Sequence, residues 1–307
     1  MKKMNRREAS KLMGGFTIGS LMLPSLVFQS NETIQKRKIR SSGELLPVVG
    51  LGTWQSFDVN NDVNGRNRLL KVLKEMKKHG GSLIDSSPMY GSSERVVGDL
   101  THQIGLKEHF FYATKVWING EKRGIQQMEH SMKLMKTDKI DLMQIHNLID
   151  WKTHLKTLKK WKEDGRIRYW GITHYLNSSH DMLARIVKTE KPDFVQFNYS
   201  IDNTNAEKNL LNIAKESGVS VIINRPFNGG GLFRLTKGKK LPEWCKHYKI
   251  ESWAQFFLKY ILSNEAVTAV IPGTSKPHHL VDNMMAGFGN LPDENTRRRM
   301  LSLIKTM

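Results

Sequence analysis

The chain has 307 residues, a formal charge of +19 and one cysteine, so its length suits two small domains or one large α/β barrel. The single Cys245 excludes an internal disulfide. The basic residues are spread over amphipathic stretches, and the sequence contains no zinc-finger, RNP or helix-turn-helix pattern, so we expect no nucleic-acid partner.

The first thirty residues differ from the rest of the chain. They combine a basic start, the pair Arg6 and Arg7, and an apolar run of 17 residues over 12–28. This order is typical of a signal peptide, and the arginine pair indicates the twin-arginine route, which exports proteins already folded. Ala9 and Ser10 precede Lys11 where an apolar pair is usual, and no Ala-x-Ala cleavage site follows, so an uncleaved anchor or a buried helix is the alternative. The apolar run is short for a membrane span, which needs about 20 residues.

These features predict two segments. We expect residues 1–30 to be a twin-arginine-like signal peptide or anchor of a bacterial protein, and residues 31–307 to be one barrel domain. The predicted location is the periplasm or cell envelope, with the cytoplasm as the alternative. The export machinery would be a transient partner, and no stable membrane span is expected unless the signal stays uncleaved.

From Val48 onward, short β-branched or aromatic runs alternate with amphipathic stretches, as in βα units around a parallel sheet. The runs that read as strands are 48–51, 82–85, 110–114, 141–145, 167–172, 194–198, 220–224 and 268–271. Two of the predicted helices, 67–80 and 206–218, end at a glycine, as a helix stop should. Eight such units predict an α/β fold, a (β/α)8 TIM barrel with a short N-terminal hairpin over 39–47.

The rival dinucleotide-binding fingerprint of an open α/β sheet is incomplete here. Gly50 and Gly52 supply its first two glycines, but Gln55 stands at the third position and no helix is predicted to start there. The barrel is therefore the preferred fold class.

Four polar side chains follow three consecutive predicted strands. Asp85 ends the second strand, Tyr90 lies in the loop after it, Lys115 follows the third strand and His146 follows the fourth. The C-terminal ends of barrel strands converge on one mouth, so we expect these four side chains to lie together.

Such a group can deliver a proton to a developing alkoxide. The phenol of Tyr90 has a reference pKa of about 10, and a nearby Lys115 ammonium is expected to lower it. Asp85 would keep Lys115 charged, and His146 would hydrogen-bond the substrate oxygen or the phenol. No side chain supplies a hydride, so carbonyl reduction here requires a nicotinamide cofactor.

With GLGTW at 50–54, this constellation resembles the aldo-keto reductases, and the resemblance runs over about 39–283. It implies reduction of an aldehyde or ketone by NAD(P)H. In that reaction Tyr90 would be the general acid, Asp85 and Lys115 would tune it, and His146 would position the carbonyl.

The resemblance also implies a cofactor site for NADP, with NAD possible. Thr173, His174 and Gln196 would hold the nicotinamide carboxamide, although the family usually has Ser-Asn in the first two places. Arg225 would stack on the nicotinamide, Gly229, Gly230 and Gly231 would admit the pyrophosphate, and His279 stands where a phosphate-binding arginine is often found. The remaining implied cofactor contacts are Gly52, Thr53, Asp85, Pro226, Phe227, Thr274, Lys276 and Asn283.

Trp54, Trp117 and Asn147 would line the carbonyl pocket, and no metal site is expected. Two other functions fit parts of the pattern. One is a non-catalytic nicotinamide-binding regulatory or sensing subunit. The other is a Schiff-base enzyme with Lys115 as nucleophile, which is disfavoured because Asp85 would keep that lysine protonated.

Overall fold

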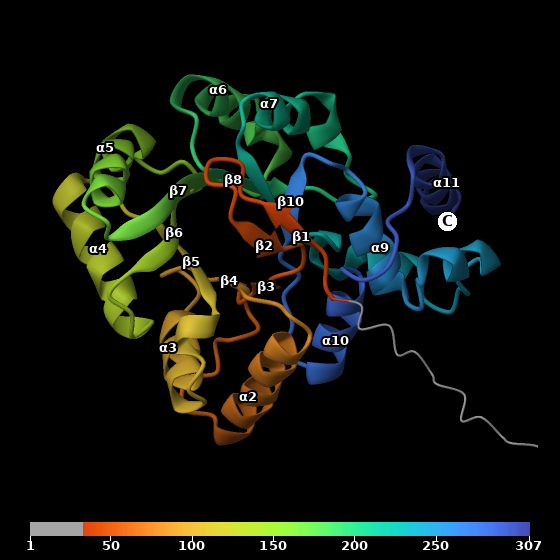
Figure 1. The fold of residues 1–307 in the computed structure, drawn as a ribbon, viewed down its shortest axis with the longest axis horizontal. Coiled ribbons are helices and arrows are strands. Elements are labelled where there is room, and N and C mark those ends of the chain that lie inside the picture. Colours follow the sequence, from red (N-terminus) through yellow and green to blue (C-terminus); the bar gives the residue numbers. More distant parts are fainter. Residues whose placement is uncertain (1–32) are drawn as a thin grey trace, which may run out of the picture. The chain divides into compact units, whose positions relative to one another are not determined.

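The structure is a computed structural model that describes residues 33–307, so the predicted signal segment lies outside the described residues. Eight parallel strands form one sheet (Figure 1). They are β3 (Leu51–Gly52), β4 (Leu83–Asp85), β5 (Phe111–Val116), β6 (Ile140–His146), β7 (Ile167–Thr173), β8 (Phe194–Asn198), β9 (Ser220–Asn224) and β10 (Val267–Val270). Parallel bridges join Val49 to Val270 and Gly52 to Gly273, which closes the sheet into the predicted barrel.

Strands β8 and β9 have the predicted bounds, and the other strands differ from theirs by one to three residues at one or both ends. Strand β5 continues to Val116 and β6 to His146, so Lys115 and His146 lie within strands rather than after them. The first barrel strand is only Leu51–Gly52, and a Cβ at the preceding Gly50 would collide with Leu83. These shifts still leave the predicted polar residues at the same end of the barrel.

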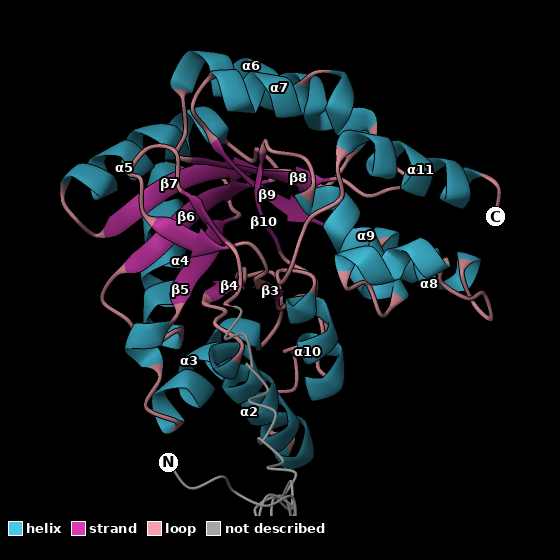
Figure 2. Ribbon diagram, turned by 45° about the vertical axis from the view of Figure 1, so that its right-hand side comes forward, coloured by secondary structure: helices cyan, strands magenta, loops and turns pink. Residues whose placement is uncertain are grey.

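Helices surround the strands, as Figure 2 shows. The helices that follow strands β3 to β8 are α2 (Val63–Lys78), α3 (Ser93–Gln103), α4 (Glu121–Leu134), α5 (Trp151–Glu163), α6 (His180–Glu190) and α7 (Leu210–Glu216). Helices α8 (Gly231–Leu235) and α9 (Trp253–Leu262) follow β9, and α10 (Pro277–Met285) and α11 (Glu294–Lys305) follow β10. The 3-10 turns are η1 (Lys107–His109), η2 (Asn177–Ser179), η3 (Asn205–Lys208), η4 (Asn228–Gly230) and η5 (Glu243–Tyr248).

The helices predicted at 67–80 and 206–218 both differ from their predicted bounds, each for a local reason. Helix α2 starts four residues before the predicted position because the Asp62 side chain accepts a hydrogen bond from the backbone N–H of Asn64. The predicted helix 206–218 is instead divided into η3 and α7, since Asn209 between them has φ −152° and ψ −56°, outside the helical region. Amphipathic periodicity gives no sign of such a break.

The barrel interior is closed at its floor by the predicted hairpin. Strands β1 (Lys36–Lys38) and β2 (Leu45–Pro47) pair antiparallel, so the hairpin begins before residue 39. Ile39 and Leu46 are buried and pack with the apolar side chains that fill the barrel. A second, larger core lies between the strands and the helices. Within residues 33–307, no helix is long and apolar enough to cross a membrane.

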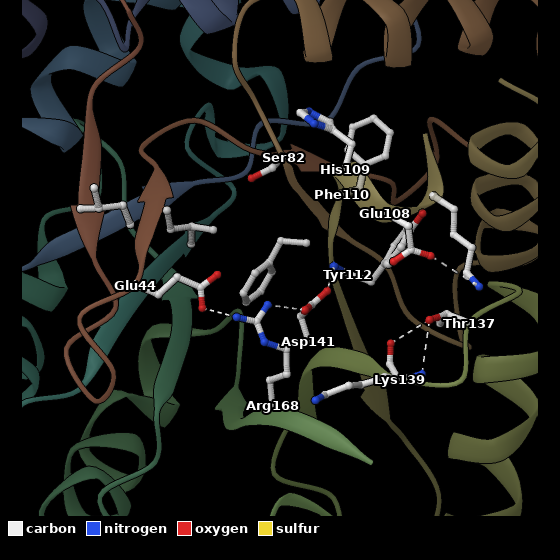
Figure 3. Close-up of a pocket in the computed structure, with 14 residues that line it drawn as sticks. Glu44, Ser82, Glu108, His109, Phe110, Tyr112, Thr137, Lys139, Asp141 and Arg168 are labelled. Atoms are coloured by element: carbon white, nitrogen blue, oxygen red, sulfur yellow. Dashed lines mark hydrogen bonds and ion pairs between the residues drawn. The ribbon is translucent and has the colours of Figure 1, made fainter. Parts of the chain in front are cut away.

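A polar cavity of about 380 Å³ lies beside this floor (Figure 3). Arg168, near the start of β7, donates to Asp141 at 2.7 Å and also bonds Glu44 of the hairpin loop. Burial raises the pKa of Asp141, although the Arg168 guanidinium opposes this effect. The cavity walls are therefore occupied by paired charges at the end of the barrel opposite to Asp85 and His146.

Candidate active site

Asp85 and Lys115 form a buried ion pair at the C-terminal end of the barrel. Lys115 Nζ lies 2.6 Å from Asp85 Oδ2, and it also donates to the carbonyl oxygen of Ser86 at 2.6 Å. Burial alone lowers the pKa of Lys115, but the Asp85 carboxylate and the Tyr90 phenol outweigh burial, so the pKa is raised. Lys115 is consequently an ammonium group at neutral pH.

The second oxygen of Asp85 is held by two amides. Gln144 Nε2 donates to Asp85 Oδ1 at 3.0 Å, and Gln196 Nε2 donates to the same oxygen at 2.9 Å. The sequence interpretation included Gln196 only as a cofactor contact and missed Gln144. The available signal for Gln144 was its position two residues before His146, because alternate residues of a strand face the same side.

The loop between β4 and α3 places Tyr90 above this pair. Tyr90 N–H donates to the carbonyl of Ser87 at 3.0 Å, which closes a turn. Gly91 has φ +59°, and a Cβ on it would lie 2.3 Å from Asp58 Oδ2. Asp58 is itself fixed, because its Oδ1 accepts hydrogen bonds from the N–H and hydroxyl of Ser92. Glycine at position 91 is therefore required for this loop path.

Tyr90 lies close to two other members of the predicted group, Lys115 and His146. Lys115 Nζ lies 5.1 Å from the centroid of the Tyr90 ring, and the ring of His146 lies edge-on at 5.9 Å. Burial raises the pKa of the Tyr90 phenol, and the Lys115 ammonium only partly offsets that effect. The expectation that Lys115 lowers the net pKa is wrong, because burial disfavours the phenolate more strongly.

His146 is a neutral imidazole in this site. Burial, followed by the charges of Lys115 and His174, lowers the pKa of His146 to about 2. Its Nδ1 lies 3.0 Å from the hydroxyl of buried Ser87. A neutral ring can donate a hydrogen bond from one nitrogen only, so it is suited to orienting a carbonyl oxygen rather than to carrying charge.

Apolar side chains border the mouth next to these residues. Trp54 and Trp117 are 52% and 40% exposed, and the Trp117 ring lies 6.2 Å from that of His146. Met89, 38% exposed, is in the loop that carries Tyr90. Asn147 follows His146 with φ +52°, and its buried Oδ1 has no hydrogen-bond partner within residues 33–307. Trp117 is thus beside His146, and Trp54 follows β3 at the same end of the barrel.

The residues predicted to hold a carboxamide are only partly brought together. Thr173 donates to Gln196 Oε1 at 3.2 Å. His174 is used differently, since its Nδ1 accepts the backbone N–H groups of Tyr175 and Leu176. Asn224 at the end of β9 donates to His174 O and Gln196 Oε1, and its buried Oδ1 has no partner in the described part of the chain.

Beyond this group lies a cavity of about 320 Å³ at the ends of β7, β8 and β9. Exposed Arg225 lines it, with its guanidinium 5.6 Å from the centroid of the Tyr175 ring. Gly229 and Gly230 have φ +61° and +87°, and the Gly230 Cβ position is free of neighbours. This turn leaves backbone accessible beside a cation, which suits an anionic ligand.

The other predicted cofactor residues have varied surroundings. Gly52 and Thr53 are at the end of β3, and the Thr53 hydroxyl donates to Ser86 Oγ at 2.9 Å. Pro226 is buried, and the Phe227 ring packs 4.8 Å from that of Phe233.

The segment after β10 carries the last predicted contacts. The Thr274 hydroxyl accepts the N–H of Lys276 at 3.1 Å, just before α10. Asn283 is buried within α10, whereas Lys276 and His279 are exposed. Residues 33–307 contain no cluster of three or more His, Cys, Asp or Glu side chains that would hold a metal ion.

Comparisons with known proteins agree on one family. A model described as the aldo/keto reductase family matches residues 48–299. Methylglyoxal reductase YeaE of Escherichia coli K12 is 27% identical over 259 residues, which cover 81% of this chain and 89% of YeaE.

Solved structures share the fold. An aldo/keto reductase from Klebsiella pneumoniae in complex with NADP and acetate has a TM-score of 0.73 at 23% identity, covering 85% of this chain and 93% of its own. A Klebsiella pneumoniae aldo-keto reductase in complex with NADPH has a TM-score of 0.74 at 22% identity, covering 88% and 96%.

Proposed function

Because the chain belongs to the aldo/keto reductase family, we propose that it reduces the carbonyl group of an aldehyde or ketone with NADPH, with NADH as the alternative donor. The observation that carries this proposal is the approach of the Tyr90 phenol to the buried Asp85–Lys115 pair and to neutral His146. The relative named methylglyoxal reductase makes small aldehydes the first substrates to examine.

The residues present fit a nicotinamide cofactor. Asn224 offers a buried oxygen without a partner, and Gly229 and Gly230 leave accessible backbone beside Arg225. We assign Thr173, Gln196 and Asn224 to the carboxamide end, and Arg225 with the glycine turn to the phosphates. Lys276 is an exposed cation suited to a further phosphate, although His279 replaces the arginine often found nearby. When bound, the cofactor supplies the hydride.

The chain itself supplies the proton. As negative charge develops on the carbonyl oxygen, the Tyr90 hydroxyl donates its hydrogen to that oxygen. The adjacent Lys115 ammonium stabilises the phenolate that is left, and Asp85 with its two amide donors keeps Lys115 in place. His146 donates a hydrogen bond that orients the carbonyl, and Trp117 lies beside His146.

The charge state of Lys115 weighs against a Schiff-base mechanism. A lysine nucleophile must lose its proton, yet the Asp85 carboxylate raises the pKa of Lys115, and that side chain is only 1% exposed. Lys115 therefore acts through its charge.

The test is NADPH and NADH oxidation by the purified full-length chain with a panel of aldehydes, ketones and methylglyoxal. We expect Tyr90→Phe to lower kcat by roughly 10²-fold or more and to keep NADPH affinity. Tyr248→Phe is the matched control, because it removes a hydroxyl that bonds Thr296 in another part of the barrel. Full turnover by Tyr90→Phe would show that another group is the acid. Cofactor binding without turnover of any carbonyl would favour the sensing function.

We further propose that residues 1–30 direct twin-arginine export of a bacterial enzyme to the periplasm or cell envelope. The support is the order of Arg6, Arg7 and the apolar run over 12–28. The double change Arg6→Lys and Arg7→Lys should trap the protein in the cytoplasm, while Lys2→Arg with Lys3→Arg should not. Unchanged fractionation of the first variant would refute export by this route.

A further inference from the structure

Ser87 and His146 form a buried contact that the chemistry described above does not explain. Ser87 Oγ lies 3.0 Å from His146 Nδ1. The Ser87 side chain has no solvent-accessible surface, and His146 is only 5% exposed. Ser87 precedes Tyr90 in the same loop, so one short segment contacts the imidazole and carries the phenol.

The hydrogen bonds of Ser87 determine the direction of this contact. The backbone N–H of Met89 points to Ser87 Oγ at 3.4 Å, and this N–H acts only as a donor. If His146 Nδ1 also carried a hydrogen, Ser87 Oγ would accept twice. Its own buried hydroxyl hydrogen would then have no acceptor among the contacts of residues 33–307. Leaving a buried donor unsatisfied costs about 1–3 kcal/mol, so the Ser87 hydroxyl donates to Nδ1.

The other ring nitrogen of His146 must then carry the hydrogen. Nε2 has no hydrogen-bond partner within the described residues, yet it is not among the fully buried atoms that lack one, so it remains reachable from the mouth. The His146 ring lies beside the rings of Tyr90 and Trp117. An Nε2–H group there is free to donate to an oxygen placed between Tyr90 and Trp117.

We propose that Ser87 is a positioning residue that holds His146 in the tautomer with hydrogen on Nε2. The role of that tautomer rests on the proposed carbonyl reduction. With hydrogen on Nε2, His146 donates to the carbonyl oxygen and does not accept the hydrogen of Tyr90. The opposite tautomer would present a basic nitrogen at the mouth, where it would compete with the substrate for the Tyr90 proton. Ser87 thus keeps the two side chains acting as donors toward the same oxygen.

The tautomer is measurable without turnover. Two-bond ¹H–¹⁵N correlation spectra of full-length protein labelled with ¹⁵N-histidine distinguish the protonated ring nitrogen from the bare one, and His146→Asn identifies the His146 signals. We expect Nε2 of His146 to be protonated and Nδ1 bare. Ser87→Ala should move population to the Nδ1–H form. Ser86→Ala is the matched control, because it removes an equally buried hydroxyl that accepts from Thr53 and does not contact His146.

Two results would overturn the proposal: hydrogen on Nδ1 in the unmodified protein, or an undiminished Nε2–H form in Ser87→Ala. If Ser87→Ala does not fold, Ser87→Gly provides the same loss of hydroxyl, and Ser87→Thr should keep the Nε2–H form. In kinetics, loss of the hydroxyl should lower kcat by about five- to tenfold at unchanged NADPH affinity. If the unmodified protein reduces no carbonyl, the proposed carbonyl reduction is wrong. The spectra still show which ring nitrogen of His146 carries the hydrogen, so the two proposals can fail separately.

Discussion

The carboxylate of Asp85 and the ammonium of Lys115 lie 2.6 Å apart, and their side chains are only 2% and 1% exposed. Removing one partner of such a pair leaves a buried charge without compensation. We therefore expect Lys115→Met to lower the free energy of unfolding by about 3–5 kcal/mol, measured by urea denaturation. Lys160→Met breaks an exposed ion pair with Asp164 and should cost at most about 1 kcal/mol. Equal losses in the two variants would contradict this account.

The raised pKa of Tyr90 makes a prediction about alkaline pH. Burial keeps the phenol protonated above its ordinary value of 10.0, so the acid is present throughout the neutral range and is lost only as pH rises through the raised pKa. The kcat for carbonyl reduction should therefore stay flat through neutral pH and fall only above about pH 10. Stopped-flow measurement of NADPH oxidation across this range is the check. A fall in kcat near pH 8 would mean that the Lys115 charge affects the pKa of Tyr90 more strongly than burial does.

The lowered pKa of His146 makes a prediction about acid stability. Below pH 6.5 the His146 side chain is protonated in the unfolded chain. It stays neutral in the native protein, because its native pKa is about 2. This contribution to stability is complete above pH 6.5 and is lost as pH falls toward 2. Between pH 7 and pH 5 the loss is about 2 kcal/mol from this residue.

The variant His146→Gln should lose correspondingly less stability over that interval, measured by urea denaturation at each pH. His130→Gln on the exposed face of α4 is the control and should follow the unmodified protein. Identical acid profiles for the two variants would show that His146 is not the group responsible.

The turn at Gly91 predicts a loss of both stability and activity. Gly91→Ala introduces a Cβ 2.3 Å from Asp58 Oδ2, at φ +59°. Gly105→Ala has a similar φ of +65° but no atom within 4 Å, so it separates backbone strain from collision. We expect about 1–2 kcal/mol of destabilisation for Gly105→Ala and about 1–3 kcal/mol more for Gly91→Ala. Only Gly91→Ala should lower kcat, because Tyr90 is its neighbour; equal effects would exclude the collision.

Much of the barrel follows from the sequence. Eight β-branched runs alternating with helical periodicity predict the strands, and the rule that strand ends converge predicts that Asp85, Tyr90, Lys115 and His146 meet. The catalytic roles of these residues remain predictions. This prediction was possible because strand ends can be recognised without knowing how neighbouring strands are aligned with one another.

Features that depend on the register between strands, or on how deeply a side chain is buried, could not be predicted in this way. Gln144 contacts Asp85 because β6 pairs with β5 so that Gln144 lies level with Lys115. Alternation along the strand places Gln144 on the same face as His146, but it does not indicate that the Gln144 amide reaches Asp85. The net pKa of Tyr90 depends on how deeply the phenol is buried, and the function of Ser87 depends on the position of one imidazole.

The hairpin floor and the Arg168–Asp141 pair lie at the end of the barrel remote from Tyr90. The floor residues therefore contribute to stability from a position remote from the substrate, whereas the Asp85–Lys115 pair contributes to it from within the site. An evolving lineage could exchange the loops around Trp54 and Trp117 while the floor stays unchanged. A protein engineer could likewise strengthen the floor first and use the gained tolerance to alter the mouth.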